Sequence, residues 1–365
     1  MKIKEVLSFF EKKYPLSLQE SFDNSGIQCG NVNYEITGAM VCFDVSLDVV
    51  EEAIEKNANL ILSHHPLIFG SGLKKIQPTD RVGKILCKAI ENKIVIYSMH
   101  TNLDSAVQGV NTVFADKLGL SQQTVLAPQP AKMKKIVFFV PKDKAYPLKE
   151  ALFQIGCGKL GSYSHCSYSM QGAGSFLPLD GANPFIGKVN QITSVDEERV
   201  EMVFPDSLQK KIVEIIYQFH PYEEPAFDII NLENYSKNVG LGKIGILPKS
   251  MELNEFLLYL KTCLDIPQIK YSGHLDKEIR KVALCGGSGA SFIKLAQSAG
   301  ADAYISGDFK YHDFFEHENK IYLVDIGHYE GEHFIRENIY NDLKENFITF
   351  AHFISEREKK EISYL

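Results

Sequence analysis

The sequence predicts an α/β protein made of two similar α/β lobes, with a smaller α+β domain inserted between them. The first and last thirds of the chain contain β-α-β patterns whose strands are near-continuous runs of Val, Ile and Leu. Such runs are typical of parallel sheets that are covered on both faces. The middle third has a different order of strands and helices. The length of 365 residues also favours several domains over a single core.

The composition narrows the class of protein. Hydrophobic residues make up 45% of the chain and charged residues 23%, which is ordinary for a globular protein. The net charge of −7 argues against nucleic-acid binding, because contacts to phosphates need a basic face. We expect no signal peptide and no membrane span, since the apolar runs are too short. The seven cysteines are scattered without CxxC spacing, so we expect reduced thiols and a cytoplasmic location.

We predict the first lobe over residues 1–128. Its strands and helices alternate, so that two β-α-β units follow each other. The predicted elements are a strand at 39–45, a helix at 46–58, a strand at 59–65, a helix at 81–93 and a strand starting at 94.

The second lobe, predicted over residues 238–365, repeats this order. The stretch 281–313 reads as strand, Gly-rich turn, helix and strand, and 320–340 reads as a strand that runs into a helix. In the third strand of each lobe a histidine precedes a carboxylate by four residues: His100 precedes Asp104, and His328 precedes Glu332. We interpret this as a degenerate internal duplication, in which equivalent strand ends face one shared cleft.

The inserted domain is predicted over residues 132–234. A linker-like "LAPQPAKMKK" precedes it, and its segments follow the order βαββαβ. This order is that of a ferredoxin-like unit. The segments are a strand at 135–141, a helix at 145–156, a Gly/Ser-rich polar stretch through 167–178, a strand at 199–205, a helix at 207–219 and a strand at 225–232.

Two adjacent histidines, His64 and His65, follow the apolar strand "LILS", and Pro66 comes next. The carboxyl ends of strands in open α/β sheets are where ligands bind. In an ideal strand the two imidazoles would point to opposite faces, so both reach one site only if the chain twists there. We expect them to bind two neighbouring metal ions, one each.

Carboxylates are the partners that can bridge two cations held by imidazoles. Asp104 follows a strand end, and Glu332 shares a face with His328 if a helix starts near that histidine. These residues complete a set of three histidines and two carboxylates that suits a water-activating dimetal site. The alternatives are a surface helix pair for His328 and Glu332, a helix cap for Asp104 and a hydrogen-bonded core histidine for His64.

The motifs "SHHPLIF", "HTNLD", "GGSGASF", "SGDFKYHD" and "DIGHYEGE" together resemble those of the Nif-three-like dinuclear metal-centre proteins, known as GTP cyclohydrolase 1 type 2 homologues. The middle stretch "HPYEEPAFDI" resembles the PII-like or CutA-like domain that is inserted in longer members. The resemblance implies a ring-shaped homohexamer whose metal sites face an interior cavity. It also implies two divalent ions per chain, with zinc as the first expectation and iron, manganese or cobalt as alternatives.

The resemblance maps the family's ligands onto five residues of this sequence, with Glu332 shared by both ions. It leaves His100 outside the direct ligand set, as a candidate for supporting the ligands or for proton transfer. The ligands it implies are His64, His65, Asp104, His328 and Glu332.

Three further groups have two interpretations each. Asp308 and His312 are candidates for proton transfer beside the metals, or for structural hydrogen bonds. The turn at 285–291 can hold an anion, or it is a tight turn in which Ser288 or Ser291 caps a helix. The segment with His220, Tyr222, Glu223 and Glu224 presents polar groups to the cavity or to a small ligand. Alternatively, it is a connection stiffened by Pro221 and Pro225.

The leading functional expectation is a metal-dependent hydrolase that acts on a nucleotide-like or phosphorylated small molecule. No residue of the sequence identifies a purine pocket. The alternative is a non-catalytic regulatory or metal-handling protein whose inserted domain senses a ligand. An open coordination position favours catalysis, whereas saturation by protein ligands favours a structural ion.

Overall fold

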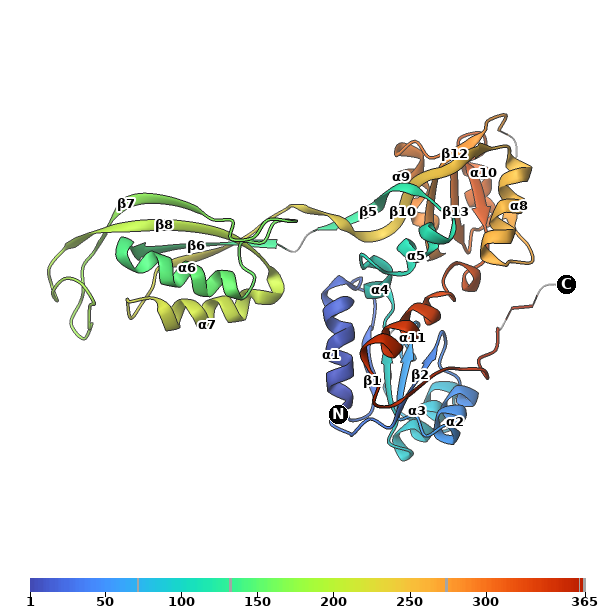
Figure 1. Cartoon of the computed structure of the whole chain (residues 1–365), viewed down its shortest axis with the longest axis horizontal. Coiled ribbons are helices and arrows are strands. Elements are labelled where there is room, and N and C mark those ends of the chain that lie inside the picture. The colour runs from blue at the N-terminus through green and yellow to red at the C-terminus, as the bar shows by residue number, and fades with distance from the viewer. Residues whose placement is uncertain (71, 131–132, 273–274, 361, 364–365) are drawn as a thin grey trace. The chain divides into compact units, whose positions relative to one another are not determined.

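The computed structural model describes residues 1–70, 72–130, 133–272, 275–360 and 362–363 (Figure 1). The chain folds into two compact units. The first, here called the core unit, combines Met1–Gln129 with Lys237–Leu365, and the second, the inserted unit, is Pro130–Ser236. The described residues form a mixed α/β fold with three sheets, which confirms the predicted class. No described helix is both long and apolar enough to cross a membrane.

The first lobe of the core unit is a five-stranded sheet with helices on both faces (Figure 1). Its strand order is β1-β4-β3-β2-β15, and all neighbours are parallel except β1 and β4. The elements are α1 (Ile3–Lys13), η1 (Leu16–Leu18), β1 (Gly26–Cys29), β2 (Gly38–Cys42), α2 (Leu47–Glu55), β3 (Leu60–Ser63), α3 (Arg81–Glu91), β4 (Val95–Ser98), α4 (Thr101–Ser105), α5 (Val110–Lys117) and, from the end of the chain, β15 (Ala351–Ile354).

The second lobe of the core unit is a six-stranded sheet of order β11-β14-β13-β12-β10-β5. Strands β12, β13 and β14 are parallel, whereas β11 and β10 are antiparallel to their neighbours β14 and β12. The elements are β5 (Ser121–Pro130), β10 (Tyr235–Met251), α8 (Leu253–Leu264), β11 (Lys270–Tyr271), β12 (Ile279–Ser288), η4 (Ala290–Phe292), α9 (Ile293–Ser298), β13 (Ala303–Gly307), α10 (Tyr311–Glu316), β14 (Tyr322–Asp325) and η5 (Tyr329–Gly331). The next helix, α11 (Ile335–Asn346), packs on β2 and β15 of the first lobe.

Local sequence signals explain why the predicted elements form. Helix α2 begins after Ser46, whose Oγ accepts the N–H of Val49, and α3 begins after Asp80, which accepts the N–H of Gly83. Such caps satisfy N–H groups that a helix end leaves without partners. In β3 every residue is buried, with Leu60 facing one core and Ile61 the other. The strand is therefore covered on both faces, as its apolar run predicts.

The two lobes share a strand arrangement. The parallel triplet β4-β3-β2 of the first lobe has its counterpart in β14-β13-β12 of the second, and each triplet carries an antiparallel strand at its edge, β1 and β11. The carboxyl ends of parallel strands meet at one edge of a sheet. The equivalent strand ends of both lobes therefore contribute neighbouring segments to one site.

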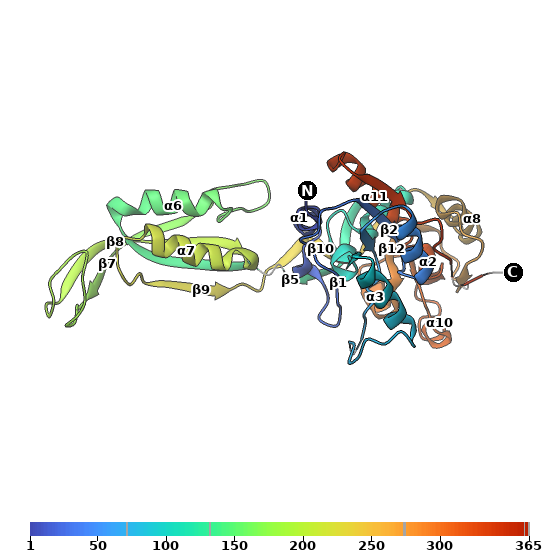
Figure 2. The ribbon, with the colours of Figure 1, turned by 90° about the horizontal axis from the view of Figure 1, so that it is seen from below.

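The inserted unit is a four-stranded antiparallel sheet of order β7-β8-β6-β9. Helices α6 and α7 pack on one face of it and build a separate apolar core (Figures 1 and 2). The Gly/Ser-rich stretch of the sequence forms the exposed strand β7. The elements are β6 (Met133–Pro141), η2 (Lys142–Lys144), α6 (Ala145–Gln154), β7 (Tyr168–Phe176), β8 (Thr193–Pro205), η3 (Asp206–Leu208), α7 (Gln209–Phe219) and β9 (Phe227–Asn231).

The end of the chain returns to the first lobe. Strand β15 pairs with β2, and the residues after it bind the carboxylate of Glu52 in α2. The Oε2 atom of Glu52 accepts the hydroxyl of Ser355 at 2.6 Å and the N–H of Arg357 at 3.1 Å, while Lys56 Nζ lies 2.7 Å from Oε1. The Glu52 side chain is only 2% exposed. It therefore joins α2 to a segment about three hundred residues later in the chain.

We predict that Glu52→Gln destabilises the chain in a pH-dependent way. Burial disfavours the ionised Glu52, but its hydrogen bonds outweigh burial and lower its pKa from 4.5 to about 2. A lowered pKa in the folded state stabilises above the unfolded pKa, and this stability is lost as pH falls through the range between the two values. Urea unfolding should give a loss of about 2 kcal/mol at pH 7 that shrinks between about pH 4.5 and pH 2.

The control is Glu55→Gln, because Glu55 forms an exposed pair with Arg357. Its unfolding free energy should stay close to that of the wild type. An equal loss for Glu52→Gln at all pH values would contradict the assignment.

Candidate metal centre

The five residues proposed as ligands from the sequence lie together in the core unit. The Oε2 atom of Glu332 lies close to three imidazole nitrogens, at 3.2 Å from His328 Nε2, 3.5 Å from His65 Nε2 and 3.6 Å from His64 Nε2. Asp104 Oδ1 lies 3.7 Å from His64 Nε2. The rings of His64 and His65 have centroids 5.1 Å apart and face the same cleft. The chain does therefore twist at the end of β3.

These residues form two overlapping groups. His65, His328 and Glu332 make one, and His64, Asp104 and Glu332 make the other. Within each group the potential ligand atoms lie within 4.8 Å of one another, close enough to hold one metal ion. Glu332 is common to both groups, so one carboxylate lies within reach of both sets of imidazoles.

Three buried polar atoms of this cluster make no hydrogen bond within the described part of the chain: His64 Nε2, Asp104 Oδ1 and Glu332 Oε2. Leaving a buried polar atom without a partner costs about 1–3 kcal/mol. A divalent cation would satisfy all three atoms, because imidazole nitrogen and carboxylate oxygen are its usual protein ligands. The residues thus fit a metal site.

The ring orientation of each histidine is fixed on the side away from Glu332. His64 Nδ1 donates to the carbonyl oxygen of Met99 at 2.8 Å, and a carbonyl can only accept. The Nε2 atom of neutral His64 therefore carries the lone pair. His65 Nδ1 lies 3.0 Å from Asp44 Oδ1, and His328 Nδ1 lies 2.7 Å from Asp308 Oδ2. Such partners orient metal-binding imidazoles and increase their basicity.

The charges of the cluster depend on one another. Burial lowers the pKa of His64. Burial acts in the same direction on His65 and His328, but hydrogen bonds with their aspartates and the nearby negative charge of Glu332 raise the pKa of His65 to about 10 and that of His328 to about 9. The imidazoles hold the pKa of Glu332 well below its usual value although burial opposes this. Burial and the Glu332 charge raise the pKa of Asp104 well above its usual value. Burial and the neighbouring charges thus act in opposite directions on these side chains, and a bound cation would reduce this conflict.

The segment around Glu332 differs from the sequence prediction. No α-helix starts at His328; the residues that follow form the short 3₁₀ turn η5, and α11 begins only at Ile335. The spacing of four residues still brings His328 and Glu332 together, because a 3₁₀ turn also places such residues near one another. The alternative of a surface helix pair is wrong, since Glu332 is buried.

His100 forms a third group of potential metal ligands with His64 and His65, whose ligand atoms also lie within 4.8 Å of one another. Its Nδ1 is 2.7 Å from Asp23 Oδ1, and Asp23 also accepts the N–H of Thr101 at 3.0 Å. The ring centroid of His100 is 5.4 Å from those of both His64 and His65. His100 is therefore a neighbour of the cluster with its own carboxylate partner.

Of the other two proton-transfer candidates, Asp308 and His312, only Asp308 touches the cluster, through His328. It follows β13 at φ +59°, a backbone conformation that favours Asn, Asp and Gly. His312 is exposed on α10, and its ring packs against Tyr311. The structure does not bring His312 to the cluster.

The glycine turn at 285–291 supports the cluster. A Cβ atom on Gly287 would lie 2.2 Å from Glu332 Oε1, and one on Gly286 would lie 3.1 Å from Glu332 Cγ. The alternative in which Ser288 or Ser291 caps a helix is wrong: η4 begins at Ala290 after Gly289, α9 follows it, and neither has a side-chain cap. The glycines allow the backbone to approach Glu332 closely.

A cavity of about 470 Å³ opens beside the cluster. His65, His100 and Glu332 contribute to its wall, as do the aromatic rings of Phe22 and Phe69. This volume is in the range of sites for small molecules. The cluster is therefore accessible to a ligand of that size.

Sequence reasoning missed Asp44 and Asp23, the carboxylates that hold His65 and His100. Each is only an acidic residue near a strand or turn in the sequence, and its partner lies 21 or 77 residues further along the chain. The one available signal for Asp44 is its place just after strand β2, whose carboxyl end adjoins that of β3.

We predict that Asp44→Asn weakens metal binding by about 10- to 100-fold, the usual effect of removing a carboxylate behind a ligating histidine. Zinc affinity measured by competition with a chromophoric chelator tests this. Asp48→Asn is the matched control, because Asp48 pairs with Lys359 at the surface. Wild-type affinity in Asp44→Asn would show that His65 needs no such partner.

We also predict that Gly287→Ala abolishes tight zinc binding, because the new methyl group displaces Glu332. Gly161→Ala controls for the backbone cost, since Gly161 has φ +57°, close to the +62° of Gly287, but no atom within 4 Å of its Cβ position. Circular dichroism should show both variants folded. Equal zinc affinity in the two variants would contradict the role assigned to Gly287.

Comparisons with known proteins identify the family of this chain. The family model described as Duf34/NIF3 (NGG1p interacting factor 3) matches residues 1–361. A "GTP cyclohydrolase 1 type 2 homolog" of Bacillus subtilis (strain 168) is 40% identical over 339 residues, which cover 92% of this chain and 90% of the relative. A protein of the same description from Halalkalibacterium halodurans is 40% identical over 327 residues, covering 88% and 87%.

Solved structures give the same result. A Bacillus cereus protein related to NIF3 superposes with a TM-score of 0.85 at 37% identity, covering 100% of this chain and 99% of the other. The Staphylococcus aureus protein SA1388 has a TM-score of 0.81 at 30% identity, with coverage of 100% and 99%. On these matches, the chain belongs to the Duf34/NIF3 family.

Proposed function

We propose that this chain is a metal-dependent hydrolase whose core unit holds two divalent ions. His65 and His328 would hold one ion, His64 and Asp104 would hold the other, and Glu332 would serve as a ligand to both. The observation that carries this proposal is the presence of two overlapping ligand groups with one carboxylate in common. We propose zinc as the metal; iron, manganese and cobalt suit the same ligands.

When bound, two such ions supply Lewis acidity and lower the pKa of water, which suits hydrolysis. The protein orients the metal-binding side chains before a metal ion binds. The contacts of His64, His65 and His328 through Nδ1 aim each Nε2 at Glu332. Gly286 and Gly287 lack a Cβ atom and so leave room for the Glu332 side chain against the backbone. The ligand geometry therefore needs little rearrangement.

We assign proton transfer to His100. It lines the cavity, and Asp23 binds its Nδ1 at 2.7 Å, which leaves Nε2 as the proton acceptor. An imidazole oriented by a carboxylate in this way is a common general base. Asp308 has a different part, because its carboxylate fixes His328.

The substrate class rests on the cavity and on the relatives. Its aromatic wall, with Phe22, Phe69 and Phe292, suits a flat ring, and the ions would attract a phosphate or a polarised carbonyl group. Relatives named as GTP cyclohydrolase 1 type 2 homologues fit such a nucleotide-like substrate. The openness of the cluster to this cavity favours catalysis over a purely structural or metal-storing role.

Further proposals concern the domains of the chain, its oligomeric state and its location in the cell. We propose three domains, 1–128, 132–234 and 238–365, of which the second is a ferredoxin-like, PII-like insertion; its strand order β7-β8-β6-β9 supports this class. We also propose a homohexameric ring with the metal sites facing its interior, on the resemblance to the family. The seven free cysteines fit the cytoplasmic location that we propose.

We predict that the zinc-loaded chain hydrolyses at least one member of a panel of nucleotides and phosphoesters, and that His65→Ala lowers this rate by about 100-fold or more. Removal of the metal by a chelator should abolish the activity, and added zinc should restore it. His165→Ala, at an exposed position of the inserted unit, serves as the control. A His65→Ala variant that keeps the wild-type rate would refute metal-dependent catalysis at this site.

A further inference from the structure

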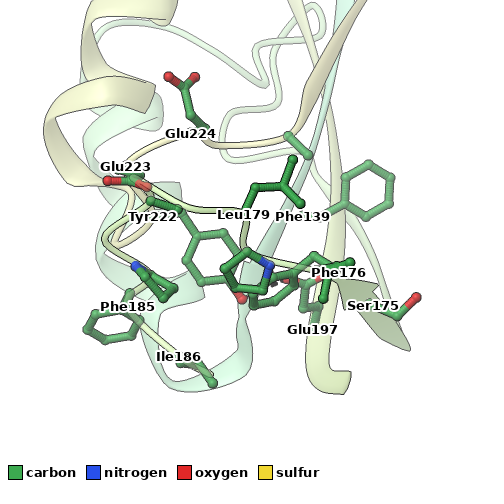
Figure 3. Close-up of a pocket in the computed structure, with 16 residues that line it drawn as sticks. Phe139, Ser175, Phe176, Leu179, Phe185, Ile186, Glu197, Tyr222, Glu223 and Glu224 are labelled. Carbon is green, nitrogen blue, oxygen red and sulfur yellow. Dashed lines mark hydrogen bonds between the residues drawn. The ribbon is translucent and has the colours of Figure 1, made fainter. Parts of the chain in front are cut away.

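A second cavity, of about 400 Å³, lies entirely within the inserted unit (Figure 3). The sheet contributes Phe139 from β6, Phe176 from β7 and Glu197 from β8. The rest of the wall comes from the loop between β7 and β8 and from the connection between α7 and β9. The volume is sufficient for a small organic molecule. This cavity is separate from the metal cluster, with which it shares no lining residue.

Aromatic rings form the centre of the cavity wall. Tyr222 lies between Phe176 and Phe185, with ring centroids 6.0 Å and 6.4 Å away at interplanar angles of 56° and 48° (Figure 3). The rings are therefore tilted towards one another and not stacked. All three rings line the cavity, and the face of an aromatic ring carries negative charge.

The charges of the wall all have one sign. Among the 16 lining residues are three glutamates, Glu197, Glu223 and Glu224, and no lysine, arginine or histidine. A phosphate or carboxylate ligand would find no positively charged side chain among these lining residues. The lining therefore disfavours anions, nucleotides included.

The three glutamates differ in role. Glu223 Oε1 accepts the N–H of Asn183 at 2.9 Å and so holds the loop between β7 and β8. The carboxylate of Glu224 points away from the apolar side chains in Figure 3. Glu197 Oε1 accepts the hydroxyl of Tyr222 at 2.8 Å. Glu197 is therefore the carboxylate that the aromatic wall holds against the cavity.

The position of Tyr222 is fixed by its neighbour His220. The Nδ1 atom of His220 accepts the N–H of Tyr222 at 3.1 Å, so its other nitrogen, Nε2, is the donor to the carbonyl oxygen of Phe139 at 2.8 Å. The segment around His220 and Tyr222 is thus attached to β6 by a hydrogen bond. Its proline residues stiffen it, and its histidine and tyrosine shape a cavity.

We propose that this cavity binds a small organic cation, namely a protonated or quaternary amine with an apolar body. The aromatic faces of Tyr222, Phe176 and Phe185 attract a cation through their quadrupoles, and quaternary ammonium groups are recognised by such cages. Glu197 supplies the opposite charge. The apolar side chains around them, Leu179 and Ile186 among them, cover the body of the ligand.

The test uses the full-length chain and three probes of similar size: benzyltrimethylammonium as the cation, benzyl alcohol as the neutral compound and 3-phenylpropionate as the anion. Saturation-transfer NMR titrations give the affinity for each. We expect the cation to bind with a dissociation constant of about 1 mM or lower and the anion not to bind at about 10 mM. Equal binding of cation and anion, or no binding of the cation, overturns the proposal.

Two variants locate the binding. Glu197→Gln preserves shape and should weaken the cation about tenfold while leaving benzyl alcohol unchanged. Phe185→Leu, at a residue that is 52% exposed and so tolerant of substitution, should weaken the cation several-fold. Glu224→Gln is the matched control and should bind as the wild type.

Folding of each variant is checked by thermal unfolding. Should Glu197→Gln fail to fold, Phe185→Leu decides the question. Wild-type affinity for the cation in a folded Glu197→Gln and in Phe185→Leu refutes the site, and so does a resonance shift map that places the cation outside the inserted unit. Coverage of the cavity by a second copy of the chain would appear as an absence of cation binding and would equally refute it.

Discussion

The core of this protein is organised around one buried carboxylate. Glu332 is held among the Nε2 atoms of three histidines at 3.2–3.6 Å, and its own Oε2 has no hydrogen-bond partner among the described residues. Such an arrangement is costly unless a cation completes it. The fold is consistent with that requirement, because the histidines come from strand ends of two lobes with the same strand order. A single β-α-β lobe could not supply ligands from opposite sides.

Segments far from the cluster in the sequence help to hold it. The backbone N–H groups of Phe43 and Asp44 both donate to Glu358 Oε1, at 2.8 and 2.6 Å, and Arg336 binds the other oxygen of Glu358 at 2.6 Å. Asp44 in turn orients His65. The last residues of the chain, which return to the first lobe through β15, thus stabilise the loop that positions one ligand. The loop that orients His65 is therefore fixed by a segment that lies more than three hundred residues later in the chain.

The sequence predicted which candidate ligands lie together, but it did not predict the residues that hold them in position. His64 and His65 are conspicuous because they follow an apolar strand, and the repeated spacing of His100–Asp104 and His328–Glu332 linked the two lobes without any structure. The contribution of Gly287 could not be predicted, because a glycine after a strand reads as a turn until the residue opposite it is known. Asp44 and Asp23 were missed for the same reason. The helix expected at His328 is a 3₁₀ turn, since spacing alone does not distinguish the two.

The bridging position of Glu332 is the central claim, and a crystal structure of the zinc-loaded chain with anomalous data at the zinc edge tests it most directly. The account predicts two anomalous peaks about 3.5–4 Å apart, one beside His65 and His328 and one beside His64 and Asp104, with Glu332 between them. A single peak, or a pair of peaks with Glu332 bound to neither or to only one, would contradict it.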